Sequence, residues 1–202
     1  DGEEFTDIPL PAALARAVLK RRNEFRAGRH CARHALRSLG VPATIPLIGP
    51  DRAPVWPEGI VGSISHSANH AIAVVASRQT CRGLGIDVEI LTGTDDLAAL
   101  SPHVATRAEM RLLRATYGPA ESFALLFSGK EAIYKAIFPQ IRRFVDFHEI
   151  ICVGLAGDRL LFRPCENIAQ ILGGNDGLSV AFDIRAGRIL SLCSLGPMTE
   201  NL

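Results

Sequence analysis

Two acidic residues alternate with apolar ones in the segment GIDVEI, residues 85–90. Because neighbouring side chains of a strand point to opposite faces, this alternation predicts a strand that presents Asp87 and Glu89 on one face. Mg²⁺ takes oxygen ligands and often shares them with the phosphates of a substrate, so two carboxylates on one face suit it. Taken alone, an acidic pair of this kind is more often the solvated face of a half-buried sheet.

A second charged set lies in the segment FSGKEAIYK, residues 127–135. Glu131 and Lys135 are four residues apart, which places them on one face of a helix, and Lys130 stands beside them. Such a helix would bring a third carboxylate and two cations to the acidic pair of the strand. By itself the spacing is typical of a surface ion pair, which contributes only about 0.3–0.5 kcal/mol.

Residues that suit a phosphate group occur earlier in the chain. Five arginines at helical spacing predict one basic stripe on a helix: Arg22, Arg26, Arg29, Arg33 and Arg37. Arginine grips phosphate through two parallel hydrogen bonds, although a solvated helix face has the same pattern. The segment GSISHS, residues 62–67, places hydroxyls and the imidazole of His66 where a strand ends, a position from which side chains reach ligands. Without other context, a histidine there is more often structural.

Composition excludes several classes of protein. The 202 residues are 48% hydrophobic, enough for a sizeable core, and a formal net charge of +1 favours neither nucleic acid nor a membrane as partner. Five widely spaced cysteines without a Cys-x-x-Cys pair indicate reduced thiols, and since neither a signal peptide nor a membrane span occurs, we expect a cytoplasmic protein. No serine hydrolase elbow, Walker loop or complete dinucleotide-binding motif is present, and His30 with His34 lacks the second ligand pair of a zinc site.

The remaining pattern predicts an α+β chain that folds as one globular unit, residues 1–202, because no linker or repeat marks a boundary. Helical periodicity covers residues 14–39, 105–117 and 121–138, and a helical turn is expected at 166–172. Short apolar and β-branched segments predict strands at residues 60–65, 71–77, 86–90, 150–155, 159–163, 178–184 and 189–195. A proline-rich arm, residues 41–58, separates the first helix from the first strand.

Five segments in order resemble the 4'-phosphopantetheinyl transferases of the enterobactin-synthase type, which move the phosphopantetheine arm of coenzyme A onto a serine of a carrier protein. They are GRHCAR (28–33), PVWP (54–57), GSISHS (62–67), GIDVE (85–89) and FSGKEAIYK (127–135), and the resemblance extends over residues 22–147. It departs from the family at Gly129, where Ala is usual, and at Phe127, which replaces the Trp of some relatives. The resemblance implies two similar α/β halves related by a pseudo-twofold axis, about residues 1–90 and 91–202, with coenzyme A and Mg²⁺ in the cleft between them.

The resemblance also implies roles for individual residues. The expected ligands of Mg²⁺, or of Mn²⁺ in its place, are Asp87, Glu89 and Glu131. The expected catalytic residues are Asp87, Glu131 and Lys135, and Lys135 and Lys130 would contact the phosphates of coenzyme A. The 3'-phosphate and the adenosine would be held by Arg29, Arg33, Arg52, Ser65 and His66.

The implied reaction transfers the arm to an acyl, peptidyl or aryl carrier protein and releases adenosine 3',5'-bisphosphate. Glu131 or a magnesium-bound water would accept the proton of the carrier serine, whose oxygen attacks the pantetheine-side phosphorus. The carrier would dock as a helix on the hydrophobic segment 112–127 of a monomeric enzyme. Two alternatives use the same residues: a magnesium-dependent phosphohydrolase of nucleotides or coenzyme A, and a non-enzymatic protein that binds coenzyme A.

Overall fold

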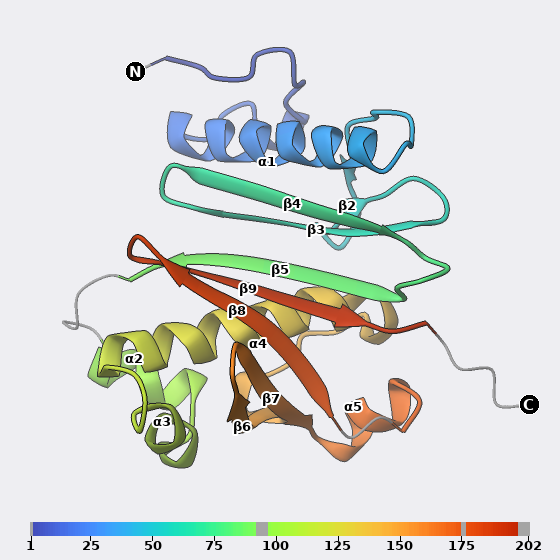
Figure 1. Ribbon diagram of the computed structural model, residues 1–202. Coiled ribbons are helices and arrows are strands. Elements are labelled where there is room, and N and C mark those ends of the chain that lie inside the picture. The colour runs from blue at the N-terminus through green and yellow to red at the C-terminus, as the bar shows by residue number, and fades with distance from the viewer. Residues whose placement is uncertain (1, 92–96, 175–176, 198–202) are drawn as a thin grey trace, which may run out of the picture. The chain divides into compact units, whose positions relative to one another are not determined.

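The computed structural model describes residues 2–91, 97–174 and 177–197 and divides the chain into two compact units (Figure 1). The first comprises Asp1–Arg82 with Gly196–Leu202, and the second is Gly83–Leu195. Both units combine helices with antiparallel strands, which confirms the predicted α+β class. The division falls at residue 83 rather than near residue 90, because strand β5 (Gly83–Ile90) pairs with a strand of the second unit.

The first unit consists of one long helix on a hairpin. Helix α1 (Leu19–Ser38) packs on the antiparallel strands β3 (Ile60–Ser67) and β4 (His70–Ser77). Gly28 permits this close approach, since a Cβ at that position would lie 2.8 Å from Ile64 Cγ2. The helix and both strands were predicted from the sequence, and their positions are confirmed.

Smaller elements complete the first unit. The 3₁₀ helix η1 (Ala12–Leu14) precedes α1. A helix was predicted over residues 14–39, but α1 begins only at Leu19, five residues later than predicted. Within the proline-rich arm, β1 (Leu47–Ile48) pairs with β2 (Pro54–Val55). The arm is therefore partly regular, although the sequence predicted no element in it.

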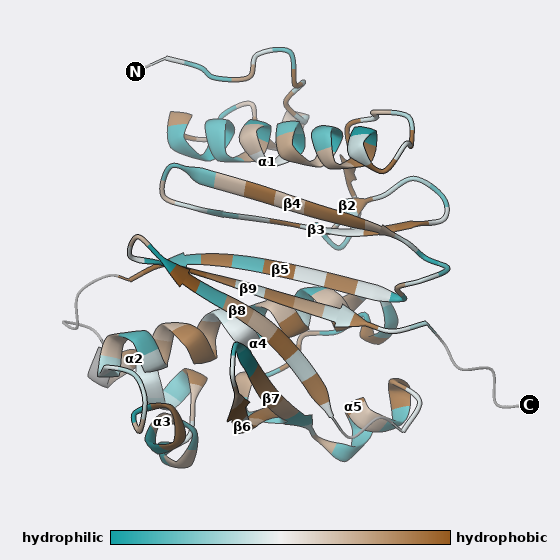
Figure 2. Cartoon of the chain, in the orientation of Figure 1, coloured by the Kyte–Doolittle hydropathy of each residue, from teal (hydrophilic) through white to brown (hydrophobic). Residues whose placement is uncertain are grey.

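The basic stripe of α1 is covered by acidic residues of the same unit. Figure 2 shows that α1 is hydrophilic along most of its length. Glu3 forms ion pairs with Arg22 and Arg26, and Asp7 forms one with Arg33. The stripe is therefore not one solvated face, because neighbouring carboxylates neutralise three of its members.

The second unit is built on a five-stranded antiparallel sheet with the strand order β5-β9-β8-β7-β6. The strands that follow β5 in the chain are β6 (Ile150–Ala156), β7 (Arg159–Pro164), β8 (Leu178–Arg185) and β9 (Arg188–Leu195). All four were predicted from alternation and flanking turns, and their bounds agree within one residue.

Helix α4 (Pro119–Ile141) packs along this sheet, chiefly against β5 and β9 (Figure 1). The shorter helices of the unit are α2 (Leu97–Val104), α3 (Arg107–Leu113) and α5 (Glu166–Ile171), with the 3₁₀ turn η2 (Phe147–Glu149). The sequence predicted no helix at α2. None of the helices in the described ranges is long and apolar enough to cross a bilayer.

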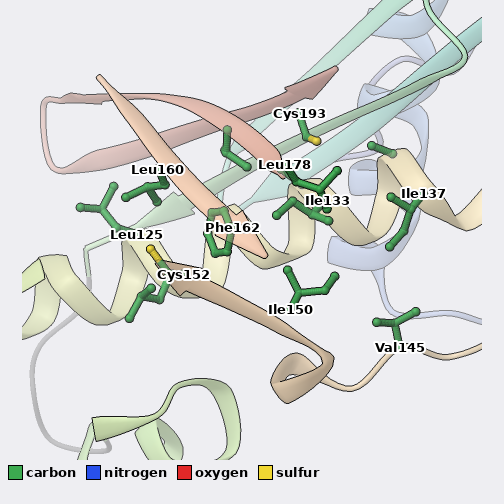
Figure 3. Packing of buried hydrophobic residues seen from close by; sticks show 14 of the residues in the cluster. Leu125, Ile133, Ile137, Val145, Ile150, Cys152, Leu160, Phe162, Leu178 and Cys193 are labelled. Carbon is green, nitrogen blue, oxygen red and sulfur yellow. The ribbon is translucent and has the colours of Figure 1, made fainter. Parts of the chain in front are cut away.

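The core of the second unit lies between α4 and the sheet. Leu125, Ile133 and Ile137 of α4 pack in one buried cluster with Phe162 of β7 and Cys193 of β9 (Figure 3). These side chains are fully buried or nearly so. Because the core fixes α4 against the sheet, polar residues on the same helix are held at defined positions over β5.

Candidate active site

Strand β5 presents its acidic residues to helix α4. A Cβ at Gly83 or Gly85 would collide with the backbone of α4, at Ala136 and Ala132 respectively, so this face of β5 lies directly under the helix. Asp87 and Glu89 are on the same face, because strand residues two apart point the same way. The predicted alternation is present, and its polar face is covered by a helix rather than by solvent.

Asp87 is joined to α4 by a charged hydrogen bond. Lys135 Nζ donates to Asp87 Oδ1 across 2.6 Å and to the carbonyl oxygen of Ile86 across 3.1 Å. Asp87 is only 3% exposed, so the ion pair lies in a medium that screens charge less than water does. The structure thus brings together an acid and a cation that the sequence predicted to lie near each other.

Glu131 lies within electrostatic range of this pair. Burial raises the pKa of its carboxyl group, the cation of Lys135 opposes that shift, and the negative charge of Asp87 adds to it. The net direction is upward from the ordinary value of 4.5. A carboxylate with a raised pKa accepts a proton more readily at neutral pH than an ordinary one does, which suits a general base.

The carboxylates fit Mg²⁺ in kind, since all three offer the oxygen ligands that this ion prefers. Among the residues that the structure describes, however, no group of three or more His, Cys, Asp or Glu side chains is arranged to hold a metal ion. Lys135 supplies a positive charge to Asp87 in this arrangement. The magnesium site of Asp87, Glu89 and Glu131 therefore stays a prediction.

Lys130 was predicted to contact the phosphates of coenzyme A, but the structure places its side chain elsewhere. Its side chain is buried, and Nζ lies 2.7 Å from Glu109 Oε1. It also donates to the carbonyl oxygens of Val104, at 2.8 Å, and Phe147, at 2.9 Å. Burial lowers the pKa of Lys130, while the hydrogen bond and charge of Glu109 raise it. The prediction is corrected: this lysine ties α4 to α3, to the last residue of α2 and to the first residue of η2.

Three of the residues predicted to bind the nucleotide line one cavity of the first unit. The cavity has a volume of about 480 Å³, and its walls include Arg29, Arg52 and His66. Arg21 lies there too and contacts the imidazole, with Nη1 3.0 Å from His66 Nε2. Reasoning from the sequence missed Arg21, although it precedes the stripe by one residue and could have been found from that position.

Arg29 is buried and held by its neighbours. Its Nε donates to the carbonyl oxygen of Pro46 across 2.7 Å, and its guanidinium lies 4.7 Å from the ring centre of Phe25. Burial, with the like charge of Arg21, lowers its pKa to about 10, so it remains a cation at neutral pH. The cavity therefore has a fixed positive charge in its wall.

Arg33 and Ser65 do not line this cavity. Arg33 Nη2 is 2.6 Å from Asp7 Oδ2, which engages its guanidinium elsewhere on α1. Ser65 neighbours Ile64 and His66, which both line the cavity, so alternation along β3 points its hydroxyl to the opposite face. For these two residues the contact with the nucleotide stays a prediction.

Comparison with known proteins agrees with the arrangement of the chain in two units. Residues 10–76 match the family "4'-phosphopantetheinyl transferase N-terminal domain", and residues 83–180 match the "4'-phosphopantetheinyl transferase superfamily". The two matches together cover most of the chain, and each falls wholly within one unit. The chain belongs to the 4'-phosphopantetheinyl transferase family.

Individual relatives share about two fifths of the aligned residues. The chain is 42% identical to 4'-phosphopantetheinyl transferase PptT of Mycobacterium tuberculosis, over 74% of this chain and 66% of that protein. It is 40% identical to enterobactin synthase component D of Salmonella typhimurium, over 66% and 56% of the two chains. It is 39% identical to 4'-phosphopantetheinyl transferase Svp of Streptomyces mobaraensis, over 72% and 63%. The chain thus spans less than two thirds of the length of these relatives.

A solved structure of a more distant relative is also similar. The holo-[acyl-carrier-protein] synthase of Thermotoga maritima is 19% identical, with a TM-score of 0.46, over 57% of this chain and 64% of that one. At this distance the likeness adds nothing to the family assignment.

Proposed function

We propose that this chain transfers the 4'-phosphopantetheine arm of coenzyme A to a serine of an apo carrier protein. The observation that carries the proposal is the Asp87–Lys135 ion pair with Glu131 beside it, inside the unit that matches the transferase superfamily. Three relatives support the same reaction: two are named 4'-phosphopantetheinyl transferases and one is named enterobactin synthase component D. The proposed acceptor is an acyl, peptidyl or aryl carrier.

In the proposed reaction, Glu131 accepts the proton of the carrier serine, and the serine oxygen forms a bond to the pantetheine-side phosphorus. The bond from that phosphorus to the bridging oxygen breaks, and adenosine 3',5'-bisphosphate leaves. Lys135 neutralises charge on the phosphates, because phosphoryl transfer depends chiefly on positioning and electrostatics. Mg²⁺, held by Asp87, Glu89 and Glu131, would supply further charge neutralisation when bound.

The cavity of the first unit is the proposed site of the 3'-phosphate. Arg29 and Arg52 offer guanidinium groups, and His66 offers a ring nitrogen. Charge-assisted hydrogen bonds from arginine to phosphate are stronger and more directional than neutral ones. Arg21 belongs to the same wall, where the carboxylate of Glu24 lies 3.6 Å from it and 3.8 Å from His66.

The carrier is proposed to dock on the second unit, on a surface that includes Arg114 and Ala115 of the predicted segment 112–127 but not the buried leucines of that segment. Leu113, Leu125 and Leu126 of that segment are fully buried in the core and offer no surface to a partner. A hollow of about 910 Å³ lies instead beside α3, lined by Pro102, Met110, His148 and three arginines, Arg107, Arg111 and Arg114.

The charge of this hollow favours an acidic partner. Its three arginines are exposed, and within the described ranges none of them forms an ion pair. The hollow is tied to the active-site helix, because Lys130 binds the carbonyl oxygens of Val104 and Phe147 next to its walls. A carrier segment with acidic and apolar side chains would therefore bind close to the helix that bears Glu131.

We further propose that the protein is a monomer. It is proposed to need neither nucleic acid nor a membrane as partner, because a net charge of +1 attracts neither. The five cysteines are free thiols, which is compatible with the reducing cytoplasm.

Mass spectrometry of several apo carriers, each incubated with the protein, coenzyme A and Mg²⁺, tests the function. The expected result is one added phosphopantetheine arm on a serine of at least one carrier. Release of phosphate without a carrier would instead favour a phosphohydrolase. Tight, magnesium-independent binding of coenzyme A without turnover would favour a binding protein.

A further inference from the structure

A buried serine lies directly across from Asp87 in the sheet. Ser191 of β9 is the register partner of Asp87 in the antiparallel β5–β9 pair, which Figure 1 shows side by side. Directly opposed residues of such a pair point to the same face, with their Cβ atoms about 4.5–5.5 Å apart. Ser191 is fully buried, and the residues two positions away on either side, Ile189 and Cys193, belong to the core under α4. Its hydroxyl therefore shares the covered face with the carboxylate of Asp87.

A second buried serine approaches the same place from α4. Gly83 lies against Ala136 and Gly85 against Ala132, so the helix runs antiparallel to the strand. Moving two residues on from Gly85 reaches Asp87, and moving one helical turn back from Ala132 reaches Ser128. Both steps advance about 6 Å or slightly more along the interface. Ser128, which is fully buried, is thus the helix residue over Asp87.

Neither hydroxyl has a hydrogen-bond partner among the residues that the structure describes. Buried hydroxyls are otherwise nearly always hydrogen-bonded, as Ser122 of the same helix is, to the carbonyl oxygen of Tyr117. Two such groups, one on the neighbouring strand and one on the covering helix, are costly for a purely structural core, where alanine would fit.

We propose that Ser128 and Ser191 are positioning residues for Asp87. Each hydroxyl reaches the carboxylate through a rotation about its χ1 angle or through one bridging water. In the structure Lys135 holds Oδ1 of Asp87. When Lys135 turns to the phosphates of coenzyme A, the two hydroxyls donate to the carboxylate and keep it correctly oriented. This inference rests on the proposed function.

Three single variants test the inference: Ser191→Ala, Ser128→Ala and, as a matched control, Ser122→Ala. For the first two we expect the kcat of arm transfer to fall about tenfold, the range found when outer hydrogen bonds to functional carboxylates are removed, with the KM for coenzyme A within twofold of wild type. Their melting temperatures should not fall, because an unsatisfied hydroxyl is removed. Ser122→Ala should show the reverse, a lower melting temperature and unchanged kinetics.

A second measurement does not depend on turnover. Calorimetric titration with Mn²⁺ and coenzyme A, without a carrier, should show about tenfold weaker Mn²⁺ binding in Ser191→Ala and Ser128→Ala. Wild-type kcat and wild-type Mn²⁺ affinity in both variants would overturn the inference, and so would a loss of stability with no change in either property. If Ser191→Ala fails to fold, the kcat and the Mn²⁺ affinity of Ser128→Ala alone test the inference.

Failure of the proposed function gives a different result. If the wild type transfers no arm but binds Mn²⁺, the function is wrong and the titration alone decides on the serines. A wild type that neither transfers the arm nor binds Mn²⁺ overturns both proposals.

Discussion

Lys135 Nζ and Asp87 Oδ1 are 2.6 Å apart, and this contact links the middle of α4 to β5 in the second unit. The lysine side chain is 26% exposed and the aspartate side chain 5%. The acid is therefore fixed, whereas the cation keeps access to the solvent from which an anionic substrate approaches.

Replacing the buried acid by its amide should separate chemistry from folding. Asp87→Asn keeps the shape and removes the charge, so we expect arm transfer to fall at least about 100-fold, as for loss of a preorganised charge in a catalytic site. Glu89→Gln should lose less, because water is able to replace an outer ligand of Mg²⁺. Steady-state kinetics with saturating Mg²⁺, together with urea unfolding, measures both effects. Equal losses in the two variants would contradict this ranking.

The raised pKa of Glu131 has a consequence for stability. A carboxyl group whose pKa is higher in the folded than in the unfolded chain binds its proton more tightly when folded, so stability is lost as the pH rises from about 4.5 through the raised pKa. Glu131→Gln removes that loss. We expect its melting temperature to exceed that of wild type at pH 8, with little difference near pH 4. A less stable variant at pH 8 would show that the carboxylate is stabilising.

Lys130 should matter for folding. Lys130→Met leaves Glu109 buried without its ion-pair partner, which we expect to cost about 3–5 kcal/mol in the free energy of unfolding. The double variant Lys130→Met with Glu109→Gln should regain part of that loss, because no uncompensated charge remains. Urea unfolding of both variants and of Glu109→Gln alone completes the cycle. Independent, additive losses would mean that the two residues do not act as a pair.

The sequence predicted regular elements better than contacts between them. The strands of the last third could be predicted because each alternates and is bounded by a tight turn, with Gly157 and Gly187 at positive φ. Helix α2 was missed because Pro102 interrupts its pattern. The sequence predicted that the charged helix face lies near the acidic strand, but it assigned Lys135 to the phosphates and did not predict the contact with Asp87.

Contacts between distant segments left no local signal. Lys130 pairs with Glu109 of another helix, and their separation in the sequence gives no indication that the two side chains meet. The resemblance assigned Arg33 to a phosphate, whereas in the structure its side chain pairs with Asp7. Such choices depend on which carboxylate the folded chain brings near, which one sequence does not show.

The basic hollow beside α3 can be tested with a charge reversal. Arg111→Glu should raise the KM for the apo carrier about tenfold, because it places a negative charge where an acidic segment binds, and should leave the affinity for coenzyme A unchanged. Arg163→Glu is the matched control, an exposed arginine of β7 outside the hollow. Identical effects of the two reversals would indicate a general influence of net charge, and the docking proposal would then be abandoned.

The most specific prediction concerns the cavity of the first unit and compares two arginines, one that lines the cavity and one that does not. Arg52 lines the cavity, whereas Arg33 is paired with Asp7. We expect Arg52→Ala to weaken the binding of coenzyme A by about 1.5–3 kcal/mol, the range for a hydrogen bond to a charged group. Binding of dephospho-coenzyme A, which lacks the 3'-phosphate, should hardly change.

Titration calorimetry of both ligands against wild type, Arg52→Ala and Arg33→Ala measures this difference. Arg33→Ala should bind both ligands as wild type does, because its guanidinium lies outside the cavity. A loss confined to coenzyme A in Arg33→Ala would restore that arginine to the phosphate site and remove Arg52 from it. An equal loss for the two ligands in Arg52→Ala would mean that this arginine contacts another part of the nucleotide.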